Sequence, residues 1–166
     1  MIEVLISWNT HDLTVAQQSI LKEELEQSVH KYRRPQALSS LPVDSSVARL
    51  TEYIEKAYEV AVMMVKSGSL IITVQCLTLE SLESLWNDYC CGHLNVIVER
   101  FLVTYEIKRK LGVDNVRLKT TIEKENYLIC KKAFTGNSGE WGTLSRQAFF
   151  WEHVFWLNKF YAWRGV

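Results

Sequence analysis

Three side chains that could carry covalent chemistry lie within four positions of one another: Cys90, Cys91 and His93. A cysteine thiolate is a strong nucleophile and a nearby histidine can accept its proton, so this group is a candidate nucleophile pair. The competing interpretation places His93 on the surface at a helix end, after Gly92, with thiols that do no chemistry. We favour the second interpretation and keep a small Cys-dependent enzyme as an alternative function.

The same residues could contribute to a zinc site, which needs four ligands. Among the four cysteines and four histidines of the chain, only Cys90, Cys91 and His93 are close in sequence. Adjacent side chains on a helix point about 100° apart, so the two cysteines would not share a face. We therefore expect no metal and no cofactor. The cysteines form no Cys-x-x-Cys pair and show no regular spacing of the kind found in secreted disulfide proteins, so we expect reduced thiols.

Paired carboxylates that could serve as a general acid and base occur at Glu23 and Glu24 and at Glu80 and Glu83. All four lie on predicted helix surfaces opposite apolar stripes, where no burial would shift a carboxyl pKa. Nineteen basic and nineteen acidic residues cancel, which argues against a binder of nucleic acid. The sequence predicts a protein that is not an enzyme and has no nucleic-acid partner.

The composition is that of a globular chain, with 48% hydrophobic and 23% charged residues among 166. The chain has no run of 18 apolar residues, so we predict no membrane span. The opening segment MIEVLISW has no basic residues before its apolar stretch, so it does not resemble a signal peptide. We expect a cytoplasmic location.

Residues 1–45 are predicted to form an amphipathic helix followed by a linker. Helical spacing relates Leu21, Leu25, Val29 and Tyr32, and Thr14 with Gln17 forms a candidate capping box. Pro35 and Pro42 mark the linker. Strict alternation from Ile2 to Trp8 makes that segment a candidate extra strand.

Residues 46–134 are predicted to form the main domain, an α+β fold that is helix-rich. An apolar stripe from about Ser46 to Lys66 predicts one long helix. The run Leu70–Cys76 is short, apolar and rich in β-branched residues, which is typical of a central strand. A second strand is expected near 115–122, with helices over 79–89, 94–103 and 123–134 and a short turn ending at Gly112.

The two predicted strands supply the candidate partner-binding residues. Ile71, Thr73 and Gln75 alternate with Leu70, Ile72 and Val74, and one of these sets must face away from the helices. On the second strand the polar side consists of Arg117, Lys119 and Thr121. The competing interpretation is that these residues simply face solvent.

Residues 135–166 form a third region, a Gly-rich loop and then an aromatic tail. Eight aromatic residues stand close together in it: Phe149, Phe150, Trp151, Phe155, Trp156, Phe160, Tyr161 and Trp163. The tail could be a packed helix, a membrane-surface contact, or a segment without a selected function. It lacks the lysine-rich polar face of a membrane-surface helix. Together with the helix over 15–32, it also raises the alternative of a helical self-association domain.

A family resemblance rests on the consecutive pattern GSLIITVQC, TLESLESLWNDYCCGHL, VERFLVT, IKRKLGVDNVRLKTTI and ENYLICKKA. Over about residues 47–134 this pattern resembles the amino-terminal domain of the tumour-necrosis-factor-receptor-associated death-domain adaptor (the TRADD-N-like domain), and is similar to versions in multidomain innate-immunity proteins of invertebrates. The resemblance implies an α-β sandwich related to the ferredoxin-like topology. It also implies a non-catalytic adaptor in apoptotic or innate-immune signal transduction.

In the vertebrate member of that family, the exposed sheet docks onto a tumour-necrosis-factor-receptor-associated factor. The resemblance therefore implies signalling proteins, such a factor among them, as partners. The family also has a strand directly before the one at Leu70–Cys76, where the stripe described above predicts a helix. We therefore carry over the family's domain class and signalling context and expect a sheet that lacks one edge strand. We do not carry over the family's docking surface or the identity of its partner.

Overall fold

The computed structural model describes residues 1–8, 11–33, 45–67 and 70–136, which form six helices and a four-stranded antiparallel sheet. This confirms the expected helix-rich α+β class. The chain divides into two compact units, Met1–Phe134 and Thr135–Val166. Beyond its first two residues, the predicted loop and aromatic tail at 135–166 lies outside the described residues. None of the described helices is long and apolar enough to cross a bilayer.

The sheet consists of β1 (Ile2–Trp8), β2 (Val60–Lys66), β3 (Leu70–Cys76) and β4 (Leu118–Ile122). Their order across the sheet is β2-β3-β1-β4, and every neighbouring pair is antiparallel. The strands expected at 2–8 and 70–76 are confirmed, and the strand expected near 115–122 begins at Leu118. The extra strand is a central one, because it pairs with both β3 and β4.

Helices connect the strands on the two long crossovers. Between β1 and β2 the chain forms α1 (Val15–Arg33) and α2 (Ser46–Tyr58), and between β3 and β4 it forms α3 (Leu79–Cys90), α4 (His93–Leu102) and α5 (Tyr105–Leu111). The last helix, α6 (Lys124–Thr135), follows β4 directly. Apart from the additional helices, this is the β-α-β-β-α-β connectivity of ferredoxin-like folds. A relation to that group stays a prediction.

The prediction of a helix from about Ser46 to Lys66 is wrong over its last third, which is strand β2. Helix α2 ends because Glu59 adopts a left-handed conformation, with φ 52° and ψ 48°, and its N–H bonds the Glu55 carbonyl as a C-cap. The following residues include the β-branched Val60, Val62 and Val65, and they pair with β3. The strand directly before β3 is therefore present, and the sheet does not lack this edge.

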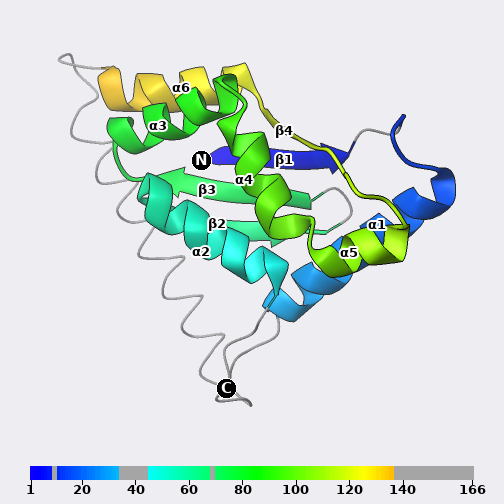
Figure 1. The fold of residues 1–166 in the computed structure, drawn as a ribbon. Helices are drawn as coiled ribbons and strands as arrows, with labels where there is room; N and C mark the ends of the chain where they lie inside the picture. The colour runs from blue at the N-terminus through cyan, green and yellow to red at the C-terminus, as the bar shows by residue number, and fades with distance from the viewer. Residues whose placement is uncertain (9–10, 34–44, 68–69, 137–166) are drawn as a thin grey trace, which may run out of the picture. The chain divides into compact units, whose positions relative to one another are not determined.

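The core lies between the sheet and the helices. On β1 the side chains of Ile2, Val4 and Ile6 are fully buried, and their partners across β3 are Val74, Ile72 and Leu70. In Figure 1, helices α2 and α4 lie in front of the sheet. Because Ile2, Val4 and Ile6 are buried, we assign them to the face that the helices cover. Alternate residues of β1 therefore face the helices and the remaining ones face away.

The N-terminal helix is an integral part of the first unit. Its predicted capping box is present: the Thr14 N–H donates to Gln17 Oε1 over 2.9 Å, and the Gln17 N–H donates to Thr14 Oγ1 over 3.3 Å. Leu21, Leu25 and Val29 are buried in the core. The apolar stripe of α1 is thus occupied within the unit, and the segment 1–45 also provides the central strand β1.

Candidate interaction surface

One face of the sheet carries the candidate partner-binding residues, and we call it the open face. It contains Glu3, Leu5 and Ser7, the β1 residues that alternate with the buried ones. Leu5 pairs with Ile71 on one side and with Thr121 on the other. Leu5 stays partly exposed at the centre of a four-stranded sheet, so the described residues leave this face uncovered.

Five of the six candidate residues belong to the open face, and the sixth, Arg117, lies just before β4. Thr73 pairs with Glu3 and Lys119 pairs with Ser7, which places the β3 row and the β4 row on the same side of the sheet as Leu5. Lys119 and, just before β4, Arg117 are exposed, whereas Ile71, Gln75 and Thr121 are partly exposed. Thr73 is only 7% exposed, so little of it is available to a partner.

Leu5 was not predicted from the sequence, although this residue lies between the predicted rows on β3 and β4. The alternation of residues 2–8 would assign Leu5 to the face opposite Ile2, Val4 and Ile6. The missing information was the position of this strand between β3 and β4, which depends on pairing over long sequence distances.

The open face combines an apolar centre with charged margins. On β2, Met64 is 46% exposed and pairs with Thr73, so it extends the apolar area of Leu5 and Ile71 toward that edge. Lys66 Nζ lies 3.8 Å from Glu3 Oε1, which neutralises one charge of each sign. An apolar centre with a polar rim is the arrangement typical of protein interfaces.

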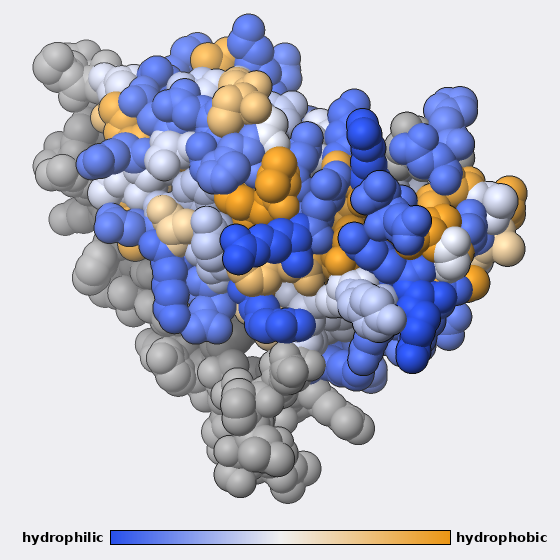
Figure 2. Space-filling model, viewed as in Figure 1, coloured by the Kyte–Doolittle hydropathy of each residue, from blue (hydrophilic) through white to orange (hydrophobic). Residues whose placement is uncertain are grey.

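The opposite, helical face has a different character. Figure 2 shows that hydrophilic residues cover most of the face viewed there and that hydrophobic residues occur as separate small patches. Single exposed apolar side chains such as Val96 on α4 and Tyr105 on α5 are ordinary on a protein surface. The open face of the sheet is therefore the better candidate for a partner.

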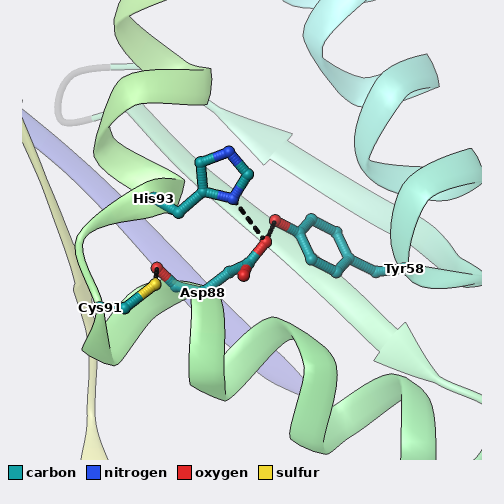
Figure 3. Close-up of polar contacts among 4 residues, drawn as sticks. All are labelled: Tyr58, Asp88, Cys91 and His93. Atoms are coloured by element: carbon teal, nitrogen blue, oxygen red, sulfur yellow. Dashed lines mark hydrogen bonds and ion pairs between the residues drawn. The ribbon is translucent and has the colours of Figure 1, made fainter.

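The candidate cysteine and histidine group is organised around Asp88. Its Oδ2 atom accepts a hydrogen bond from the Tyr58 hydroxyl over 2.8 Å and lies 3.1 Å from His93 Nδ1. The Cys91 thiol donates instead to the Asp88 main-chain carbonyl over 3.6 Å (Figure 3). Within the described part of the chain, no hydrogen bond joins Cys90 or Cys91 to His93.

This Asp88 cluster has an evident structural role. Tyr58 ends α2, Asp88 lies in the last turn of α3, and His93 begins α4. Burial, and then the hydrogen bond to Asp88, raise the pKa of the Tyr58 hydroxyl, so it stays protonated and donates. The cluster fastens three helix ends together. Sequence reasoning missed Tyr58 because it lies 30 positions from Asp88.

The described residues contain no cluster of three or more histidine, cysteine, aspartate or glutamate side chains suited to a metal ion. Comparison of the chain with protein-family models, with curated proteins and with solved structures gave no match.

Proposed function

We propose that this chain is a non-catalytic protein-interaction module, acting in the cytoplasm as an adaptor in apoptotic or innate-immune signal transduction. A partner protein docks on the open face of the sheet. The observation that carries this proposal is the position of Leu5, partly exposed at the centre of the sheet between Ile71 and Thr121.

Strand β2 adds support from the family resemblance. The TRADD-N-like domain has a strand directly before the one at Leu70–Cys76, and β2 occupies that place here. Residues 60–66, which were expected to be helical, form a strand, so the edge strand that accompanies the family's docking surface has a counterpart here. The partner suggested by the resemblance is a tumour-necrosis-factor-receptor-associated factor.

The physical character of the open face suits such a partner. Leu5, Ile71 and Met64 offer apolar area that a partner can desolvate. Residues near the centre of such areas contribute most of the binding energy in protein interfaces. Lys119 and Arg117 lie at the β4 margin, where charges influence partner choice and association rate more than affinity.

The proposal is tested by binding of the full chain to the receptor-binding domain of a tumour-necrosis-factor-receptor-associated factor, measured by calorimetry. The test variant is Met64→Glu, at a 46% exposed position on the open face. The matched control is Val96→Glu, which adds a charge at a 59% exposed position on α4.

We expect the open-face variant to bind about tenfold more weakly or worse, and the control to bind like the unmodified chain, with equal thermal stability in all three. Equal binding by both variants would exclude the open face as the docking surface. Absence of binding by the unmodified chain to any such factor would remove the proposed partner.

A further inference from the structure

The two edges of the sheet carry hydrogen bonds that a sheet edge ordinarily lacks. Strands β2 and β4 are the outermost strands, and each has only one neighbour. An edge strand normally presents free N–H and C=O groups, to which a strand from another chain can pair. In this protein, side chains from the helices reach both edges and bond their amides.

At the β4 edge, two side chains of α4 accept from two strand amides. The Leu118 N–H donates to Glu99 Oε1 over 2.8 Å, and the Thr120 N–H donates to Asn95 Oδ1 over 2.8 Å. The Thr120 hydroxyl donates to the same Asn95 oxygen. These side chains therefore take the place of a neighbouring strand.

The spacing of these contacts follows from the geometry of the two elements. Asn95 and Glu99 are four residues apart on α4, which is about 6 Å along a helix and on one face. Leu118 and Thr120 are two residues apart, which is about 6.7 Å along a strand, with both amides pointing the same way. One helical turn thus matches the repeat of the strand edge.

The β2 edge has a similar feature at one position. The Val62 N–H donates to Glu55 Oε1 over 2.9 Å, from the last turn of α2. A shift in the pairing register between Val62 and Met64 further breaks the regularity of this strand. Irregularities of this kind make an edge a poor template for another strand.

We propose that Asn95 and Glu99 act as an edge clasp, which keeps β4 from pairing with the β4 strand of a second copy of this chain. The uncapped edge would be self-complementary. In an antiparallel pair centred on Thr120, Lys119 would face Thr121 of the copy, and Leu118 would face Ile122. No like charges would oppose each other, so the clasp is what prevents pairing.

The inference is independent of the signalling role, although it bears on it. If the β4 edge is closed, a partner meets the sheet through its open face and not by strand addition, which is the other common way of binding to a sheet. The clasp can be tested without any partner, so its failure and the failure of the proposed function are distinguishable.

The test compares three forms of the full chain: unmodified, Asn95→Ala with Glu99→Ala, and Glu99→Gln. The glutamine control makes the same change in net charge as the double variant. It keeps one acceptor oxygen at each position, the Asn95 Oδ1 atom and the amide oxygen of the new glutamine. Hydrogen exchange of the Leu118 and Thr120 amides is measured at low concentration, and sedimentation velocity is measured over a range of concentrations.

We expect both amides to be protected in the unmodified chain and in the control, and to exchange about tenfold faster or more in the double variant. We also expect concentration-dependent association of the double variant alone, with protection of the two amides returning as it associates. Unprotected amides in the unmodified chain, or a double variant that stays monomeric, would overturn the inference.

If the double variant does not fold, Asn95→Ala alone decides the matter. The clasp then predicts faster exchange at Thr120 with Leu118 still protected. Equal exchange at the two amides would contradict it.

Discussion

Replacement of Tyr58 by phenylalanine removes one hydroxyl from the junction of α2, α3 and α4. The Tyr58 side chain is buried, at 4% exposed, and its hydroxyl donates to Asp88 Oδ2. Phenylalanine fills the same space, so the change deletes a hydrogen bond without opening a cavity. The expected result is a lower free energy of unfolding with an unchanged fold.

The size of the loss depends on what the carboxylate can do afterwards. A hydrogen bond to a charged group contributes roughly 1.5–3 kcal/mol. The side chain of Asp88 is 31% exposed and retains its contact with His93, so water can replace part of the lost bond. We therefore expect Tyr58→Phe to lower the free energy of unfolding by about 1–1.5 kcal/mol, which is just below that range.

The assay is urea unfolding of four proteins at pH 7: unmodified, Tyr58→Phe, Asp88→Ala and the double variant. The result for Asp88→Ala alone is ambiguous. This variant leaves the Tyr58 hydroxyl without its acceptor, and it also removes a negative charge near the C-terminal end of α3. The double-mutant cycle cancels the effect of the lost charge, because that effect is also present when residue 58 is phenylalanine. We expect a coupling of about 1 kcal/mol between the two side chains.

A coupling within about 0.3 kcal/mol of zero would refute this reasoning, because it would mean that the two groups do not stabilise each other. The pH dependence provides a second check. The folded pKa of Tyr58 is raised above its usual 10.0, so its contribution to stability is complete below about pH 10 and declines above it. Tyr58→Phe should lose less stability than the unmodified chain above pH 10. Parallel losses would contradict the assignment.

Two further outcomes are expected. Thr14→Ala should lower the free energy of unfolding by about 1 kcal/mol. Gln17→Ala should lower it by more, because the Gln17 side chain also donates to the Leu111 carbonyl over 2.8 Å. Equal losses in urea unfolding would count against a stabilising role for the hydrogen bond from Gln17 to Leu111. Burial raises the pKa of Cys76 to about 11, whereas Cys91 is exposed. Iodoacetamide at pH 8, followed by peptide mass spectrometry, should therefore modify Cys91 faster than Cys76, and equal rates at these two residues would contradict this order.

The strands that were predictable from the sequence are those with an unambiguous local pattern. The run Leu70–Cys76 is apolar and β-branched, and Ile2–Trp8 alternates strictly, so both were placed correctly. Strand β2 was missed because its apolar residues continue the helical stripe of α2 without a break. Only the left-handed Glu59 separates them, and a glutamate gives no sequence signal for that conformation.

The open face was half predictable for a related reason. Period-two alternation identified the rows on β3 and β4, and the register shows that both belong to one face. Leu5 joins them only because β1 lies between these strands. That position reflects pairing across the whole unit, which local patterns do not contain. Similarly, Cys91 and His93 are two positions apart in sequence, but the hydrogen bond of each is to Asp88.

The central position of β1 also determines when the sheet can be completed during synthesis. Val4 pairs with Ile72 on one side and with Ile122 on the other. The first strand to be synthesised is therefore paired on both sides only after the last strand has been synthesised. Contacts at such sequence separations slow folding, and the hairpin of β2 and β3 can form long before. A fragment that begins at Ser46 would keep all of residues 47–134, on which the family resemblance rests, but would lose the strand that joins β3 to β4. Such a fragment would not reproduce the fold of the chain.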